Sequence, residues 1–288
     1  MLFILSSLMM LSSMASNVVE ERAGYSFEGC KLVNLTLNVT DPVTDLPGVV
    51  QARIYKARGR HSPSELRSII LVPPTGGENI LDEWYGNYLC TSGFQVVLVQ
   101  NWSHQLDVKI DMSMHDEGAD RSLAALRHVL DYLNPQRSTQ VGILGTSVGA
   151  LSAELVLGFD SRLNAGVLIA GGADQAEIIA RSNLNTLVQL REERMKIFGY
   201  RTLDEYEQAL REHIHINPVD FANYSGKKTV LAFVGTEDLT VPTKNQLELV
   251  AAFEAQSIAY QGDHLATIEH TAFWEKSRIA AFFESQLK

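Results

Sequence analysis

The chain has 288 residues, with 34 acidic against 24 basic side chains and a formal net charge of −10. Hydrophobic residues make up 45%, with 20 glycines and 8 prolines, a composition that excludes a mostly disordered, collagen-like or coiled-coil chain. An acidic surface without a Lys/Arg-rich run repels phosphate backbones, so we expect no nucleic-acid partner. The length predicts one domain with a large core, or two small ones.

The first fifteen residues have the pattern of an export signal. Residues 2–11 form an apolar run broken only by Ser6 and Ser7, and Ser13 and Ala15 place small residues where a signal peptidase cleaves. The run is shorter than the roughly 20 residues of a membrane-spanning helix. We therefore predict a cleaved signal peptide over residues 1–15, a periplasmic or secreted protein, and no stable membrane span. A cytoplasmic protein with an apolar N-terminus is the alternative.

Two segments near the N-terminus alternate apolar and polar residues. Residues 33–40 place Val33, Leu35 and Leu37 on one face, which predicts a strand with one exposed side. Residues 50–55 alternate in the same way after a turn rich in Pro and Gly. We expect an antiparallel hairpin at the edge of a sheet, within a domain that spans residues 24–288.

The rest of the chain alternates buried strands with helices. Five continuous aliphatic runs predict strands buried on both faces: residues 69–72, 96–99, 141–144, 165–170 and 230–234. Leucines at spacings of three and four over residues 123–133 predict an amphipathic helix. This order predicts an α/β fold with a mostly parallel central sheet and helices on both faces. The charged, helix-favouring residues 175–222 predict a small helical cap inserted between two core strands. A final short strand over 257–260 and a C-terminal helix from about residue 272 to 287 complete the chain.

A serine lies where the third core strand is expected to turn into a helix. Gly145-Thr146-Ser147-Val148-Gly149 follows that strand directly, and small residues follow it. This is the nucleophile-elbow pattern, in which a sharp turn exposes the serine hydroxyl and flanking glycines let strand and helix approach. We predict that Ser147 is a nucleophile.

A serine nucleophile requires a base and an acid, which are expected later in the chain in the order Ser, acid, His. His264 follows the last predicted strand and is the expected base, whereas His270 next to the C-terminal helix is expected to be structural. Asp238, after residues 230–234, is the expected acid that orients the imidazole. Glu237 is a close alternative to Asp238, and Asp174 is a more distant one.

The charge that develops on a substrate carbonyl requires backbone N–H donors. One is expected from Val148, directly after the nucleophile, and the other from the loop over residues 72–78. Pro73 and Pro74 have no N–H, so Thr75 or Gly76 is the expected donor.

From about Lys31 to Ser285 the chain resembles the α/β-hydrolase family of serine hydrolases, on the contexts of Ser147, Asp238 and His264. In the oxyanion loop, where the family usually has His-Gly, this chain has Pro73-Pro74. The resemblance implies a serine hydrolase that cleaves carboxylic esters of small molecules through an acyl-enzyme. An exopeptidase or amidase of the same fold, or a non-catalytic binding relative, is the alternative.

Other residues have weaker implications. Trp102 and His104 follow a strand end and are expected to line the pocket. His213 and His215 lack a third ligand nearby, so we expect no metal site. No phosphate-binding glycine motif follows a strand, so no nucleotide cofactor is implied. Cys30 and Cys90 are compatible with one disulfide, which the sequence alone neither requires nor excludes.

Overall fold

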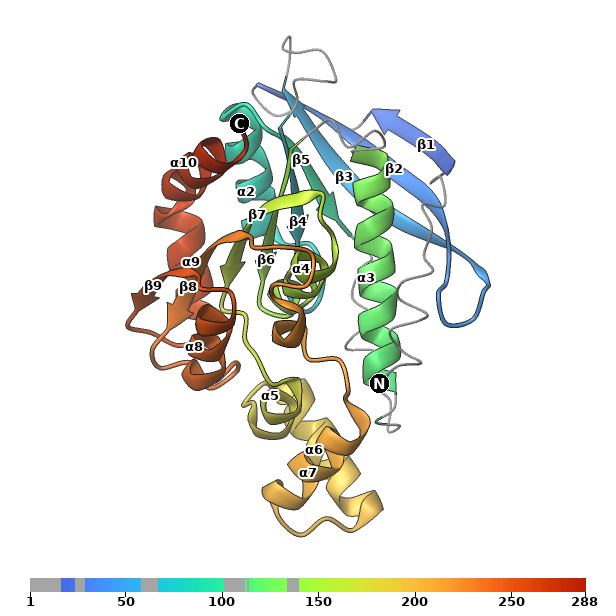
Figure 1. The fold of residues 1–288 in the computed structure, drawn as a ribbon, viewed down its shortest axis with the longest axis vertical. Helices are drawn as coiled ribbons and strands as arrows, with labels where there is room; N and C mark the ends of the chain where they lie inside the picture. Colours follow the sequence, from blue (N-terminus) through green and yellow to red (C-terminus); the bar gives the residue numbers. More distant parts are fainter. Residues whose placement is uncertain (1–16, 24–28, 58–66, 101–111, 113, 134–139) are drawn as a thin grey trace.

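The computed structural model describes residues 17–23, 29–57, 67–100, 112, 114–133 and 140–288. Residues 1–15, the predicted signal peptide, lie outside this part of the chain. Nine described strands form one sheet in the order β1-β2-β3-β5-β4-β6-β7-β8-β9 (Figure 1). They are β1 (Asn17–Ala23), β2 (Cys30–Thr40), β3 (Pro47–Ala57), β4 (Ser68–Val72), β5 (Gln95–Val99), β6 (Val141–Thr146), β7 (Leu163–Ile169), β8 (Thr229–Gly235) and β9 (Gln256–Tyr260).

The central strands are parallel and buried. Every pair from β5 through β4, β6, β7 and β8 to β9 runs parallel. All residues of β4 and β6 are buried, because helices cover both faces of the sheet. The five aliphatic runs and the α/β architecture with a mostly parallel sheet are therefore confirmed.

The predicted hairpin is formed by β2 and β3, in antiparallel register with Val33 opposite Ile54 and Leu37 opposite Val50. Its predicted position at the sheet edge is wrong, because β1 pairs antiparallel with the outer side of β2. The sheet thus begins at Asn17 and not after residue 24. An edge strand can join a sheet through backbone hydrogen bonds alone. The sequence of this charged segment therefore needs no alternating apolar pattern, and none was there to predict the strand.

Helices cover the two faces of the sheet. The described helices of the main body are α2 (Ile80–Thr91), α3 (Met114–Leu133), α4 (Val148–Phe159), α8 (Thr243–Ala252), α9 (His264–Trp274) and α10 (Lys276–Gln286), with a 3-10 helix η2 at Pro218–Phe221. Buried side chains of α3, α4 and α8 share one hydrophobic cluster with one face of the strands. Side chains of α2, α9 and α10 share a second cluster with the opposite face. Among the described helices, none has the length and apolarity to cross a membrane.

The predicted single C-terminal helix is wrong in its start and its continuity. Asp263 caps α9 by accepting a hydrogen bond from the N–H of Ala266 at 2.9 Å, so the helix begins at His264. Glu275, with φ −105° and ψ 2°, separates α9 from α10.

Cys30 and Cys90 form a disulfide. Cys30 begins β2 and Cys90 lies in the last turn of α2, and both are fully buried. The bond therefore ties α2 covalently to the sheet.

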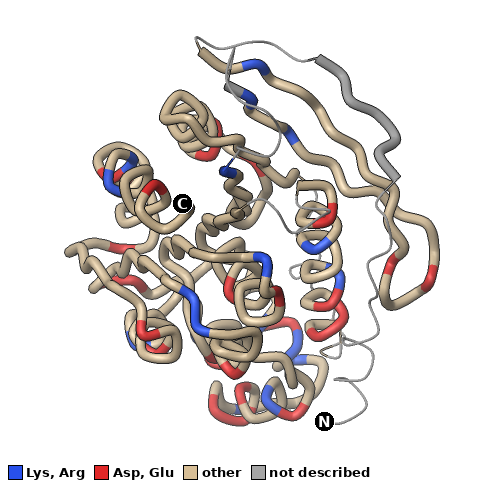
Figure 2. The backbone as a smooth tube through the Cα atoms, turned by 45° about the horizontal axis from the view of Figure 1, so that its top comes forward, with Lys and Arg blue, Asp and Glu red and all other residues tan. Residues whose placement is uncertain are grey.

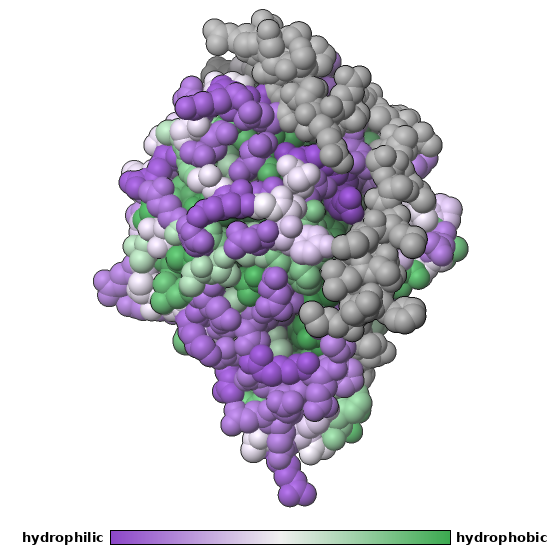
Figure 3. All heavy atoms as spheres, viewed as in Figure 1, coloured by the Kyte–Doolittle hydropathy of each residue, from purple (hydrophilic) through white to green (hydrophobic). Residues whose placement is uncertain are grey.

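The segment predicted as a cap contains α5 (Gln175–Arg181), α6 (Asn185–Phe198) and α7 (Leu203–His213) between β7 and β8. We call these three helices the cap. They project from one end of the molecule (Figure 1), and their buried side chains form a third hydrophobic cluster together with Met112. The face of the cap that Figure 3 shows is largely hydrophilic. Acidic and basic positions lie close together along α3 and in the cap (Figure 2).

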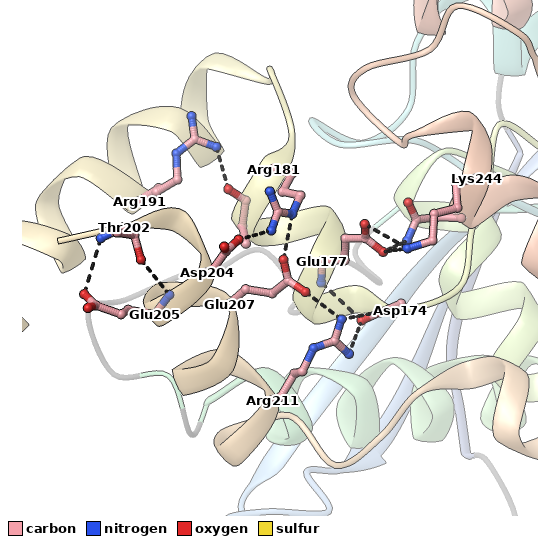
Figure 4. Close-up of polar contacts among 12 residues, drawn as sticks. Asp174, Glu177, Arg181, Arg191, Thr202, Asp204, Glu205, Glu207, Arg211 and Lys244 are labelled. Atoms are coloured by element: carbon pink, nitrogen blue, oxygen red, sulfur yellow. Dashed lines mark hydrogen bonds and ion pairs between the residues drawn. The ribbon is translucent and has the colours of Figure 1, made fainter. Parts of the chain in front are cut away.

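Ion pairs hold α5 and α7 together (Figure 4). Arg181 of α5 bonds Glu207 at 2.7 Å, and Arg211 of α7 bonds Asp174, which precedes α5, at 2.9 and 2.5 Å. Lys244 of α8 bonds Glu177 at 2.9 Å, which links the cap to the main body.

Candidate active site

Ser147 occupies a strained turn between β6 and α4. Its backbone angles are φ 56° and ψ −123°, in the left-handed region that side chains rarely adopt. A Cβ at Gly145 would lie 2.4 Å from the Gly149 carbonyl oxygen, and one at Gly149 would lie 2.2 Å from that of Val72. Only glycine fits these two positions. The predicted strand–turn–helix arrangement around Ser147 is therefore present.

The turn brings Ser147 to His264 and Asp238. Ser147 Oγ lies 2.8 Å from His264 Nε2, and His264 Nδ1 lies 2.7 Å from Asp238 Oδ2. The three residues follow β6, β9 and β8, whose carboxyl ends meet at one edge of the parallel sheet. When Asp238 Oδ2 accepts a hydrogen bond from Nδ1–H of His264, Nε2 of the neutral imidazole carries no proton and can accept the hydrogen bond from the Ser147 hydroxyl.

Asp238 is buried and fully hydrogen-bonded. Its Oδ1 accepts from the backbone N–H groups of Thr240 at 2.8 Å and Val241 at 3.0 Å. Its Oδ2 accepts from Gln246 Nε2 at 2.7 Å in addition to His264. Four donors thus fix the orientation of the carboxylate toward the imidazole.

The alternative residues lie elsewhere. Glu237 is exposed and accepts a hydrogen bond from Gln261. Asp174 caps α5 and pairs with Arg211. The ring of His270 lies 4.2 Å from that of Tyr260. The structure therefore brings Asp238 and His264 to Ser147. It does not bring Glu237, Asp174 or His270 there.

Two of the three residues expected to supply oxyanion donors line the cavity beside Ser147. Thr75 and Val148 line the same cavity as Ser147, whereas Gly76 is not among its described lining residues. Val148 is the first residue of α4, where backbone N–H groups have no partner within the helix. The close approach of Gly149 to Val72 and Pro73 places the loop after β4 against the start of α4.

A cavity of about 50 Å³ lies beside Ser147 under the cap. Most of its described lining is aliphatic: Val148 and Leu151 from α4, Ile178, Ile179, Leu184 and Leu187 from the cap segment, and Val241 from the loop before α8. Its polar lining consists of Ser147, Thr75, His115, Gln175 and Thr240. Such a cavity suits a small, mostly apolar group bound next to the serine hydroxyl.

His115, in the first turn of α3, also lines this cavity. Arg194 Nη1 donates to His115 Nε2 at 3.3 Å and to Tyr206 Oη at 3.2 Å. Burial and the adjacent guanidinium charge lower the pKa of His115 to about 4. The imidazole is thus neutral at pH 7, with its proton on Nδ1.

Sequence reasoning missed Gln246 and Gln175. Gln246 comes one helical turn into α8 and Gln175 begins the cap, and neither stands in a recognisable motif. Trp102 and His104, the expected pocket residues, lie outside the described residues. His213 bonds the Ala209 carbonyl and His215 bonds Asp116. In the described part of the chain, no three metal-binding side chains come together.

Solved structures resemble most of the chain. The acetyl xylan esterase from Paenibacillus sp. R4 matches with a TM-score of 0.75 at 12% identity, over 99% of this chain and 94% of that one. Acetyl xylan esterase 1 from Thermoanaerobacterium sp. JW/SL YS485 matches with 0.65 at 15% identity, over 90% and 86%. A cold-adapted esterase from an Arctic intertidal metagenomic library matches with 0.61 at 14% identity, over 94% and 100%.

No protein-family model matches the sequence, and no curated protein matches it significantly. At these low identities the similarity concerns the fold alone. The strand order, the turn at Ser147 and the structural matches together show that this chain has the α/β-hydrolase fold.

Proposed function

We propose that the protein is a serine hydrolase that cleaves carboxylic esters of small molecules through an acyl-enzyme. The observation that carries the proposal is the hydrogen-bond chain from Ser147 through His264 to Asp238 at the carboxyl edge of the sheet. A serine hydroxyl is a weak nucleophile until a base takes its proton, and this chain supplies the base together with a group that orients it.

In the acylation step, Ser147 Oγ forms a bond to the ester carbonyl carbon while its proton passes to His264 Nε2. The ionised Asp238 stabilises the resulting imidazolium. His264 then returns the proton to the alcohol oxygen as the carbon–oxygen bond breaks. Deacylation repeats these transfers with water as the nucleophile, which releases the acid and restores Ser147.

The tetrahedral intermediate carries a negative charge on the former carbonyl oxygen. We propose that the backbone N–H of Val148 and a second N–H from the loop after β4, at Thr75 or Gly76, bind this oxygen. Each such donor contributes about 3 kcal/mol to stabilisation of the transition state. The position of Thr75 on the cavity beside Ser147 favours Thr75.

The size of the cavity supports a short substrate group. A water molecule needs roughly 10–15 Å³ of such volume, so a cavity of about 50 Å³ holds a group of a few heavy atoms. Several structurally similar proteins are esterases by name, which agrees with ester cleavage over amide cleavage.

Labelling with a fluorophosphonate, followed by peptide mapping, tests the proposal. We expect one modified peptide, carrying the phosphonate on Ser147, and turnover of p-nitrophenyl acetate that exceeds turnover of aminoacyl anilides. A wild-type protein that neither reacts with the probe nor hydrolyses any ester would instead be a non-catalytic binding protein. Faster cleavage of the anilides would identify a peptidase or amidase.

We also propose that the protein is exported. The disulfide between Cys30 and Cys90 supports this, because such bonds persist mainly in oxidising compartments. N-terminal sequencing of the mature protein is the test. A start close after Ala15 is expected, and a mature chain that begins at Met1 contradicts export.

A further inference from the structure

A polar group without a partner lines the cavity beside Ser147. Gln175 is only 7% exposed, and its Nε2 has no hydrogen-bond partner among the described residues. Its neighbours in the cavity wall, Ile178 and Ile179, are aliphatic. A buried amide donor without an acceptor is unfavourable, and such groups are rare in folded proteins. An acceptor that enters the cavity with the substrate would satisfy it.

The backbone at Gln175 is held firmly. Asp174, just before it, has φ 59° and its carboxylate is bonded to Arg211 (Figure 4). Glu177, two residues after it, bonds Lys244 and the buried Asn245. The first turn of α5 is thus tied to both α7 and α8. Such support keeps a binding group in position before the ligand arrives.

The cavity favours a neutral ligand. Among the described polar residues that line the cavity, His115 is the histidine, and its lowered pKa of about 4 keeps the ring neutral at pH 7. No charged side chain is among the described residues that line the cavity, so a carboxylate or ammonium group that entered would lose its hydration without a direct ion-pair partner in the wall. A neutral oxygen, as in an ether, a hydroxyl or a second carbonyl, accepts a hydrogen bond without that penalty.

We infer that Gln175 is a specificity-determining residue whose Nε2 donates a hydrogen bond to a neutral substrate oxygen outside the scissile ester group. The substrates are then short esters that carry such an oxygen in the acyl or the alcohol part. This inference rests on the proposed ester hydrolysis at Ser147. The cavity of about 50 Å³ beside Ser147 limits the oxygen-bearing group to a few heavy atoms.

Two pairs of isosteric esters test the inference. The acyl pair is p-nitrophenyl methoxyacetate and p-nitrophenyl butyrate, and the alcohol pair is 2-methoxyethyl acetate and butyl acetate. Within each pair one ether oxygen replaces one methylene. Dividing each kcat/KM ratio by the same ratio for hydrolysis by hydroxide ion removes the difference in intrinsic reactivity.

We expect the wild type to prefer the oxygenated ester of one pair by about tenfold, the size of one hydrogen bond. Gln175→Met, which keeps the side-chain length without the donor, should abolish this preference by lowering kcat/KM for the oxygenated ester about tenfold relative to its carbon partner. Gln208→Leu, on the exposed surface of α7, is the control and should retain the preference. The pair that responds identifies the part of the substrate that Gln175 contacts.

Equal corrected rates for both members of both pairs in the wild type overturn the inference, even if Gln175→Met fails to fold. A wild-type preference that persists in a folded Gln175→Met also overturns it. In both cases the proposed ester hydrolysis stands, because the esters are cleaved. A wild type that hydrolyses none of the four esters removes the proposed function and this inference together.

Discussion

Gln246 Nε2 donates a hydrogen bond of 2.7 Å to Asp238 Oδ2, the same oxygen that accepts from His264 Nδ1. The amide is itself fixed, because Nε2 also donates to the Val241 carbonyl at 2.7 Å and Oε1 accepts from the Gly235 N–H at 3.0 Å. Gln246 thus connects the end of β8, the loop that carries Asp238, and α8. It is a positioning residue for the carboxylate.

Replacement of Gln246 by Leu should lower kcat by about tenfold with little change in KM, because one charge-assisted hydrogen bond to the orienting carboxylate is lost. The imidazole Nδ1–H resonance of His264 should also shift in the proton NMR spectrum. Asn245→Leu is the matched control, since it removes a neighbouring buried amide of α8 that does not contact Asp238. Equal losses of kcat in the two variants, with an unmoved resonance, would show a purely structural role.

Asp82 should make stability depend on pH. Burial raises its pKa to about 7, and the nearby Glu78 and Glu83 charges act in the same direction, while the hydrogen bond from Asn79 opposes them. The unfolded chain releases this proton near its ordinary pKa of 3.8. Between those values the folded state binds more protons at Asp82 than the unfolded chain, so the contribution of this group to stability is most favourable at low pH and falls as the pH rises toward 7.

Asp82→Asn should therefore flatten the pH profile of the free energy of unfolding. Relative to wild type, the variant should gain about 2–3 kcal/mol between about pH 5 and pH 8. Urea denaturation at several pH values measures this gain. Glu193→Gln, which removes a charge from the exposed surface of α6, is the control. If the free energies of unfolding of wild type and Asp82→Asn changed in parallel with pH, the raised pKa of Asp82 would be contradicted.

The cap wall of the cavity should set the preferred acyl length. Leu184 lines the cavity and is half-buried, so its replacement by Ala enlarges the space at moderate cost in stability. The kcat/KM ratio of p-nitrophenyl hexanoate to acetate should rise about tenfold, the size of discrimination that one or two methylenes give in an apolar pocket. Leu203→Ala, at the exposed start of α7, should leave the ratio unchanged. A ratio that Leu184→Ala does not raise would place the acyl group outside this cavity.

The Cys30–Cys90 disulfide should stabilise the fold. It closes a loop with a sequence separation of 60, for which loss of the bond costs about 2–4 kcal/mol. The double substitution Cys30→Ser with Cys90→Ser should lower the free energy of unfolding by that amount, and reduction of the wild type should match it. Identical denaturation curves for the oxidised wild type and the double variant would exclude a stabilising bond.

The sequence allowed the central sheet to be predicted because burial on both faces leaves a continuous aliphatic run, as over residues 69–72 and 141–144. The turn at Ser147 could also be predicted, because the close backbone approaches at Gly145 and Gly149 accept glycine alone. The positions of Asp238 and His264 are set by the strands that they follow. Topology therefore brings them together without further information.

Other features depend on contacts that the local sequence does not encode. β1 joins the sheet through backbone pairing, and its charged sequence has no apolar alternation that would predict a strand. Gln175 and Gln246 are amides on helices, where they look like surface residues, and only packing against the main body buries them. The break at Glu275 between α9 and α10 has neither Gly nor Pro to mark it.

Ser147→Ala, compared with Ser152→Ala, tests the proposed nucleophile most directly. Ser152 is a buried serine of α4, the helix that follows Ser147, and its hydroxyl has no partner among the described residues. Ser147→Ala should lose fluorophosphonate labelling and lower kcat for p-nitrophenyl acetate by a factor on the order of 10⁴ or more, with an unchanged circular dichroism spectrum. Ser152→Ala should retain both activities. Labelling or turnover that survives in a folded Ser147→Ala would show that another residue attacks the ester.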